Sequence, residues 1–309
     1  MRTRQMRGNL ILLLTAMIWG SAFVAQSVGM DHVGPFAFQA VRSFIGAAVL
    51  LPVIAVMDRQ KKKSPDYRKP TAEEKRLLLK SGIICGVVLG VASLLQQVGI
   101  AYTTVGKAGF ITAMYLLIVP ILGLLFKRKV SARIWFCVAV AVVGMYLLCM
   151  TEGLRLSKGD TYVCLCAIAF SVHILVIDRY APHVDGVKLS CLQFFVAGVL
   201  AGVPMLLFER PDIGALLSAW APILYAGALS SGVGYTLQVI GQKYTHPTVA
   251  SLIMSLESVF SVLAGVVILS QIPTTREFAG CALMFAAIII SQLPEKKRTP
   301  GGENGGDPA

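Results

Sequence analysis

The feature that most constrains this chain is a stretch of membrane-spanning length with one charged side chain inside it. Residues 247–270 are apolar except for Glu257 and a few hydroxyl groups. At about 1.5 Å per residue, a helix of this length crosses a hydrocarbon core roughly 30 Å thick. A carboxylate near the bilayer centre costs about 2.5–3.5 kcal/mol on insertion scales, so we expect Glu257 to face protein or water rather than lipid.

Similar apolar stretches recur along the whole chain. The 309 residues are 56% hydrophobic and 14% charged, with a mean hydropathy of +0.72, whereas soluble domains contain about 25% charged residues. We therefore predict an all-α membrane protein with ten transmembrane helices. The predicted spans are 8–29, 34–57, 77–101, 104–126, 131–149, 159–178, 187–208, 216–241, 247–270 and 275–293.

The second half of the chain repeats the first. A shift of 142 positions places Tyr244 on Tyr102 and Glu257 on Tyr115, and a weaker match at 151 positions places Phe170 on Trp19. An odd number of spans in each repeat would insert the two halves in opposite orientations, as in the inverted repeats of secondary transporters. We expect one five-helix repeat at 8–149, a second at 155–293, and a disordered cytoplasmic tail at 294–309, which has too little apolar content to fold.

The distribution of basic residues predicts the orientation. The net charge of +12 comes from lysines and arginines that cluster in connections between apolar stretches on one side of the membrane. This placement indicates contact with anionic lipid and two cytoplasmic termini in a multi-pass protein of the cell membrane. It argues against nucleic-acid binding, since no basic face or stripe is formed.

The seven cysteines do not form a metal or redox motif. All lie in apolar stretches, none forms CxxC, and no histidine stands at ligand spacing from them, so they are expected to pack as small hydrophobic residues. We predict neither a metal site nor a cofactor. No HExxH or GxSxG motif and no pair of intramembrane aspartates is present, which argues against an enzyme.

Small and polar residues inside the spans mark packing faces and a candidate cavity. Gly82, Gly86 and Gly90 share one helix face, which permits close packing or sliding. Polar groups in a bilayer either pair internally or line a pathway. We assign Arg42 to structural pairing, because no charge matches it in the second repeat. The residues assigned to a substrate cavity are Trp19, Gln96, Lys107, Tyr115, His173, Tyr235, Gln238 and Glu257.

Several sequence segments resemble the EamA-like family of the drug/metabolite transporter superfamily. They are LTAMIWGSAFVAQ, FQAVRSFIGAAVLLP, YTTVGKAGFITAMYLLIVPILGLLF and, in the second half, YTHPTVASLIMSLESVFSVLAGVVILS. The resemblance implies paired five-helix repeats around a central cavity. It also implies movement of small metabolites, often amino acids or related compounds and frequently as export.

We therefore predict a secondary transporter that works by alternating access around a midplane cavity. The expected partners are a small-molecule substrate, the lipid bilayer and protons as the coupling ion through Glu257. A channel-like facilitator is the alternative in mechanism, and a membrane-embedded enzyme or a scaffold is the alternative in class. The substrate and the oligomeric state stay open.

Overall fold

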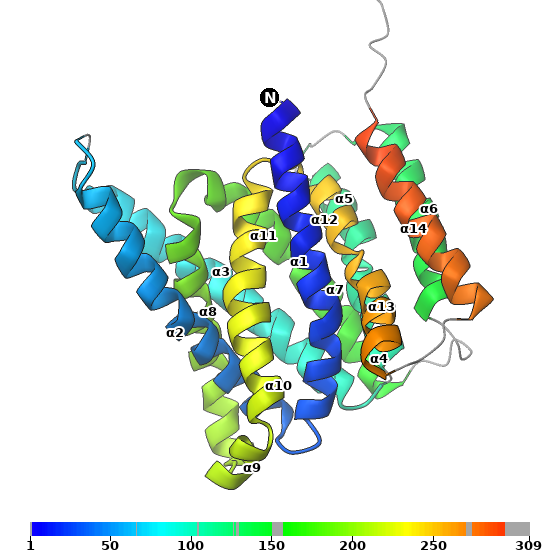
Figure 1. Ribbon diagram of the computed structural model, residues 1–309, viewed down its shortest axis with the longest axis horizontal. Helices are drawn as coiled ribbons and strands as arrows, with labels where there is room; N and C mark the ends of the chain where they lie inside the picture. The colour runs from blue at the N-terminus through cyan, green and yellow to red at the C-terminus, as the bar shows by residue number, and fades with distance from the viewer. Residues whose placement is uncertain are drawn as a thin grey trace, which may run out of the picture.

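The protein is a bundle of helices in the part of the chain that the structure describes (Figure 1). This computed structural model describes residues 2–65, 67–103, 105–125, 127, 130–149, 157–269 and 274–293. Within these ranges there is no β-strand. The predicted tail at 294–309 lies outside the described residues.

Six helices lie in the described part of the first half of the chain. They are α1 (Arg2–Gly29), α2 (Pro35–Lys62), α3 (Ala72–Ile100), α4 (Val105–Ala113), α5 (Tyr115–Leu125) and α6 (Ala132–Cys149).

The second half is more interrupted. Its elements are α7 (Lys158–Tyr180), η1 (Ala181–His183), α8 (Gly186–Pro204), η2 (Met205–Glu209), α9 (Ile213–Ser218), α10 (Trp220–Leu224), η3 (Tyr225–Gly234), α11 (Tyr235–Gln242), α12 (Pro247–Met254), α13 (Glu257–Leu269) and α14 (Thr275–Gln292). Of these, η1 is a 3₁₀ turn, and η2 and η3 are π-helical.

All ten apolar stretches of the sequence are helical, and eight of them are long and apolar enough to cross a membrane, within the described ranges. The other two stretches form α6, whose apolar part Ala132–Leu148 is shorter, and α14. The membrane-protein class is therefore confirmed, while the number of ten spans stays a prediction.

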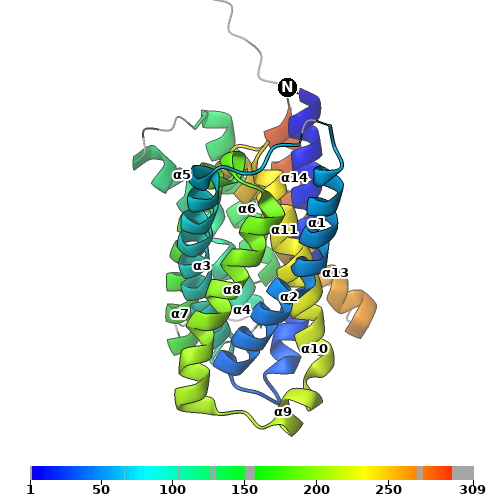
Figure 2. The ribbon, with the colours of Figure 1, turned by 90° about the vertical axis from the view of Figure 1, so that its left-hand side faces the viewer.

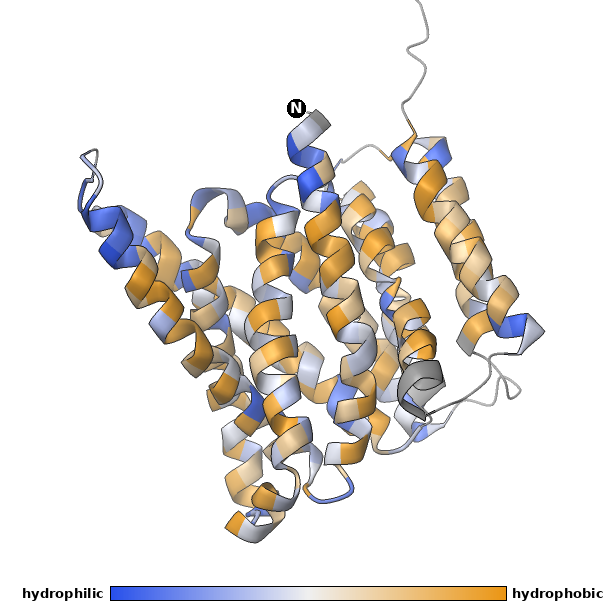
Figure 3. Cartoon of the chain, in the orientation of Figure 1, coloured by the Kyte–Doolittle hydropathy of each residue, from blue (hydrophilic) through white to orange (hydrophobic). Residues whose placement is uncertain are grey.

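Consecutive spans run in alternating directions, so the connections gather at two ends (Figures 1 and 2). The N-terminus, the α2–α3 connection, the α7–α8 connection and the end of α14 lie together at one end, which we call the basic end. The opposite end, which holds α9 and the α1–α2 connection, is the far end. Hydrophilic residues are concentrated at the basic end, and apolar residues cover most of the helices between the two ends (Figure 3).

The start of α3 follows from a capping box. Thr71 accepts a hydrogen bond from the backbone N–H of Glu74, and the Glu74 carboxylate accepts one from the backbone N–H of Thr71. Two otherwise unpaired donors are satisfied in this way, as the Thr-x-x-Glu pattern predicts. The helix therefore begins at Ala72, before its apolar stretch.

Small residues bring α3 and α8 close together. A Cβ added at Gly82 or Gly86 would lie 2.6 Å from the Cβ of Leu192 or Val196, respectively. A Cβ at Gly90 would lie 2.9 Å from a methyl group of Leu200. The glycine face seen in the sequence is thus a close-packed helix interface in this conformation.

The helix contacts of the two halves correspond to each other. α3 packs on α7 and α8, and the segment η3–α11 packs on α1 and α2. α4 and α5 pack on α7, while α12 and α13 pack on α1. α2 packs on α8, and α6 packs on α14 (Figure 1). Exchanging each element for its counterpart in the other half therefore reproduces these principal contacts.

Asp185 at the basic end combines a helix cap with an ion pair, and two substitutions separate them. Its Oδ1 accepts from the backbone N–H groups of Val187 and Lys188, and its Oδ2 lies 2.5 Å from Nζ of Lys61. Asp185→Ala removes both and is expected to cost about 1–2 kcal/mol of unfolding free energy. Asp185→Asn keeps the cap and should cost less than about 1 kcal/mol. Thermal unfolding of the purified protein measures both, and equal losses would contradict the division.

The pH dependence of this contribution follows from the Asp185 pKa. Burial disfavours the charged form, but the hydrogen bond and charge of Lys61 and the backbone N–H groups lower the pKa below its usual value. A lowered pKa contributes stability above the unfolded-state pKa of about 3.9, and this is lost as pH falls through the folded-state value. The stability difference between wild type and Asp185→Asn should thus be complete at pH 7 and shrink below about pH 4.

Candidate functional site

Two spans are interrupted at corresponding positions in the middle of the bundle. In the first, α4 ends at Ala113 and α5 begins at Tyr115; in the second, α12 ends at Met254 and α13 begins at Glu257. At both breaks a backbone N–H bonds three residues back instead of four, from Met114 to Ile111 and from Leu256 to Ile253. The local tightening turns each span into two short helices that meet inside the bundle.

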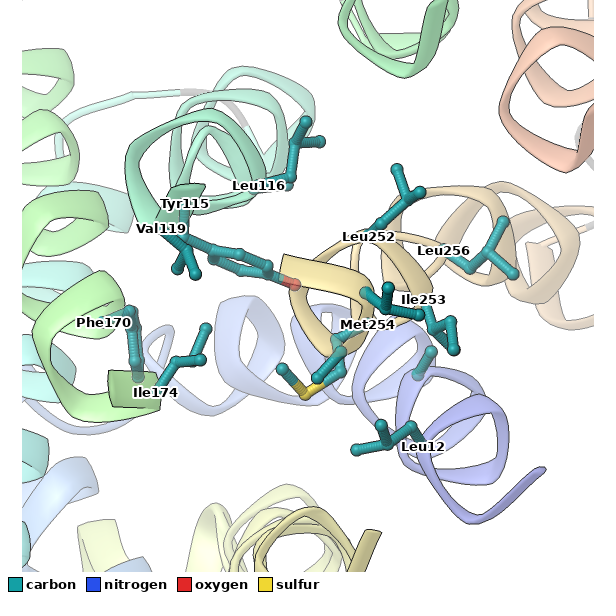
Figure 4. Close-up of a cluster of buried hydrophobic side chains, with 14 of the residues drawn as sticks. Leu12, Tyr115, Leu116, Val119, Phe170, Ile174, Leu252, Ile253, Met254 and Leu256 are labelled. Atoms are coloured by element: carbon teal, nitrogen blue, oxygen red, sulfur yellow. The ribbon is translucent and has the colours of Figure 1, made fainter. Parts of the chain in front are cut away.

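The side chains that begin the second halves of these spans contact each other. The Tyr115 hydroxyl donates a 3.0 Å hydrogen bond to Oε1 of Glu257, and the two residues are 142 positions apart. Both are buried, at 3% and 4% exposure. Figure 4 shows the Tyr115 ring with its hydroxyl directed at the junction of α12 and α13. The hydrogen bond satisfies one oxygen of a carboxylate that lies away from both ends of the bundle.

A small cavity adjoins this pair. It encloses about 30 Å³, and a water occupies about 10–15 Å³ on this measure, so it has room for about two waters. It is lined by Trp19, Ala22, Phe23, Gln26, Arg42, Gln96, Thr112, Tyr115, Phe170, Ser230, Tyr235 and Glu257. A metabolite therefore fits only if the surrounding helices move apart.

The cavity lies in the half of the bundle toward the far end. Its α1 residues fall in the second half of that helix, and Arg42 falls in the first part of α2, which starts at the far end. On the side of the basic end the bundle is filled by fully or nearly fully buried apolar side chains (Figure 4). These include Leu12, Leu116, Val119, Leu252, Ile253 and Met254. This apolar layer separates the cavity from the basic end.

Aromatic rings form one wall. The ring centroids of Trp19 and Tyr235 are 4.5 Å apart, and the Phe194 ring meets the Tyr235 ring edge-on at 5.2 Å. Nε1 of Trp19 is buried without a hydrogen-bond partner. The wall therefore offers mainly apolar aromatic surface, which is typical of small-molecule sites.

Five of the eight residues that the sequence assigns to the cavity line it. They are Trp19, Gln96, Tyr115, Tyr235 and Glu257. Nε2 of Gln96 lies 3.4 Å from Oγ1 of Thr112, a further lining residue. These five come from α1, α3, α5, α11 and α13, so the site joins both halves of the chain.

Two of the other three residues lie outside the lining, and the third is not described. His173 is fully buried outside the lining, with Nε2 3.2 Å from Oε1 of Gln193 and its ring 6.2 Å from that of Tyr235. Gln238 lies one turn after Tyr235, also outside the lining, and its Oε1 has no partner. The side chain of Lys107 lies outside the described residues.

Sequence reasoning left several lining residues unassigned. Arg42 lines the cavity although the sequence favoured a structural role for it, and Gln26, Thr112 and Phe170 line it as well. Phe170 had a signal, because the internal repeat places it on Trp19. Gln26 and Thr112 had none, since polar residues at similar spacing also occur outside the cavity.

The cavity offers several polar groups of different charge. Its polar groups are one carboxylate, one guanidinium, amides, hydroxyls and an indole N–H. Among the described residues no group of three or more His, Cys, Asp and Glu side chains is placed to hold a metal ion.

Comparison with known proteins identifies the family. The family model described as the EamA-like transporter family matches the chain twice, at residues 6–150 and 157–293. An uncharacterized transporter of Archaeoglobus fulgidus is 30% identical over 291 residues, covering 94% of this chain and 87% of the relative. A probable terminal-alkyne amino-acid exporter of Streptantibioticus cattleyicolor is 23% identical, covering 90% of this chain and 91% of the relative.

A solved crystal structure has the same fold. It matches with a TM-score of 0.74 at 20% sequence identity and covers 93% of this chain and 98% of its own. The fold, the apolar helices and the family match define a multi-pass integral membrane protein of the transporter class. The chain belongs to the EamA-like transporter family.

The close approach of α1 to Glu257 depends on a missing side chain at Gly20. A Cβ there would lie 2.6 Å from the Glu257 carbonyl oxygen and 2.6 Å from the Cβ of Phe260. Gly20→Ala should therefore push α13 away from α1 and destabilise the protein by about 1–3 kcal/mol. Thermal unfolding in detergent measures the loss.

Gly202→Ala on α8 is the matched control. A Cβ at Gly202 meets nothing nearer than a ring atom of Phe44 at 3.9 Å. This variant should be neutral or more stable by about 0.5–1 kcal/mol, because alanine is the better helix former. Equal stability of the two variants would contradict the role assigned to Gly20.

Proposed function

We propose that the protein is a secondary transporter of small metabolites that works by alternating access. The observation that carries this proposal is the buried Tyr115–Glu257 hydrogen bond, which joins two interrupted spans at the cavity. Broken helices that meet at a central site are a recurring feature of transporters, because the free backbone groups and the joints serve binding and movement.

The proposal includes ten spans in two inverted five-helix repeats, at 8–149 and 155–293. The two family-model matches support a duplication, as do the equivalent breaks before Tyr115 and Glu257. The reciprocal helix contacts are those expected of a twofold-related pair. α5 runs toward the basic end and α13 runs away from it, which favours opposite orientations of the halves (Figure 1).

During the transport cycle, the bundle closes in turn at the basic end and at the far end. In this conformation an apolar layer that includes Leu12 and Met254 closes the basic end, and the cavity lies beyond it. Rocking of one repeat against the other would separate this layer and close the far half. The two helix breaks are suitable joints, because each already replaces a regular helical hydrogen bond.

Glu257 couples the cycle to protons in this proposal. A lone buried carboxylate is costly in an apolar region, and protonation removes the charge. The Tyr115 hydroxyl stabilises the ionised form, so proton binding and the contact between the two breaks compete. A change of protonation therefore changes the force that holds α5 and α13 together.

The substrates we propose are amino-acid-like solutes, and the proposed direction is export. The name of the Streptantibioticus cattleyicolor relative supports this class. The concentration of cationic side chains at the basic end supports a cytoplasmic location for that end and for both termini in the cell membrane. His173, Gln238 and Lys107 remain in the proposal as residues that contact solute when the bundle opens.

Replacing Glu257 by glutamine tests the coupling. Proteoliposomes are loaded with the twenty standard L-amino acids, and efflux is followed by mass spectrometry with and without a pH gradient. One pH unit supplies about 1.4 kcal/mol per proton, about a tenfold concentration ratio for one-for-one exchange. The wild type should approach this response for the solutes it carries, and Glu257→Gln should lose it.

Glu74→Gln is the control for the same chemical change. Glu74 is exposed at the basic end, and glutamine is also suited to a capping box. Its gradient response should equal that of the wild type. An undiminished response in Glu257→Gln would remove Glu257 from coupling, and efflux without saturation or exchange would favour a channel-like facilitator.

A further inference from the structure

Arg42 is a buried cation without an ion-pair partner among the residues that the structure describes. It lies on α2, is 2% exposed, and lines the cavity beside Trp19 and Tyr235. Its Nε has no hydrogen-bond partner. The side chain rests on the ring of Phe38, with Cζ 5.9 Å from the ring centroid.

No acidic group pairs with Arg42 in the part of the chain that the structure describes. Three ion pairs at the basic end join Lys61 to Asp185, Arg68 to Glu74 and Lys188 to Asp58, and none of them includes Arg42. Glu257 lines the same cavity but is bonded to Tyr115 and forms no ion pair with Arg42. A buried charge without a partner is expensive, so it persists where a ligand supplies the partner.

The chemistry of this arrangement selects an anionic oxygen group. A guanidinium is planar and matches the two oxygens of a carboxylate with two parallel N–H donors. Trp19 lines the same cavity beside Arg42, and its indole N–H is buried without a partner. The space that the two side chains line holds about two waters in this conformation.

The same cavity is also lined by an acidic side chain. One oxygen of the Glu257 carboxylate accepts the hydrogen bond from Tyr115, and Glu257 also lines the cavity. Aromatic rings, among them Trp19, Phe170 and Tyr235, line the space with these two charges. A solute with one negative and one positive group would pair with Arg42 and Glu257 at once.

We propose that Arg42 is the carboxylate anchor of the transport site, and that Glu257 receives the ammonium group of the same zwitterionic solute. This inference rests on the proposed function, since it concerns the solute that the opened cavity holds. The class is an amino acid, with its carboxylate on Arg42 and its side chain against the aromatic wall. The role assigned to Arg42 thereby changes from structural pairing to substrate specificity.

A specificity exchange tests the assignment. Purified protein is tested by thermal unfolding with each of the twenty standard L-amino acids. Every amino acid that stabilises the wild type is then compared with its decarboxylated amine and with the carboxylic acid that lacks the amino group. We expect the zwitterion to bind at least tenfold more tightly than either analogue.

The variants distinguish the two ends of the solute. Arg42→Met should weaken the amino acid at least tenfold and leave binding of the amine unchanged. Arg42→Lys should fall between wild type and Arg42→Met, because it keeps the charge and loses the planar fork. Glu257→Gln should weaken the amine and leave binding of the carboxylic acid unchanged. Arg276→Met, at an exposed arginine outside the cavity, is the control for loss of one positive charge and should bind as the wild type does.

The results separate this inference from the proposed function. Wild-type affinity for amino acids in Arg42→Met, with unchanged thermal stability, would overturn the role of Arg42 and leave the transporter proposal intact. The same holds if the wild type transports solutes that carry no carboxylate. Absence of any solute movement in wild-type proteoliposomes would overturn both. Equal weakening of zwitterion, amine and acid by Arg42→Met would show a structural role and also overturn the inference.

Discussion

The structure depends on how one carboxylate is buried in an apolar bundle. Glu257 lies at a helix break, and the Tyr115 hydroxyl from the corresponding break donates to it. Moving a charge from water into such surroundings is costly unless hydrogen bonds compensate. The features that build the site surround the Glu257 carboxylate and compensate the cost of burying it. They include two broken spans, a tyrosine at the equivalent repeat position, and α1 brought close by Gly20.

Close helix packing is what allows polar groups to meet in the interior. Glycines on α3 face the side chains of α8, and Gly20 faces the backbone of Glu257. In a lipid environment helices gain little from burying apolar side chains, so van der Waals contact and internal hydrogen bonds hold them together. The cavity inside this packed bundle is too small for a metabolite, and an apolar layer closes it toward the basic end in this conformation.

The sequence predicted the fold class better than the geometry of the site. Long apolar stretches predicted an all-helical membrane protein, and the described part of the chain is helical with eight candidate spans. No sequence signal marks the break before Glu257, because the residues at the break are Ser255 and Leu256 and not glycine or proline. In the first repeat the break lies at Met114, six residues before Pro120. Helix interruptions without these residues arise from packing between helices, which a single sequence does not reveal.

By itself, the sequence determined the class of protein, the internal repeat and the few polar residues that any site has to use. These follow from local physics: the length of apolar stretches, the cost of charge in lipid and the clustering of lysine and arginine. Only the tertiary structure decided which polar residues meet. It brought Arg42, Tyr115 and Glu257 to one cavity and placed His173 and Gln238 outside its lining. The reason is that helical spacing fixes the face of a residue, whereas the rotation and depth of each helix depend on contacts with distant segments.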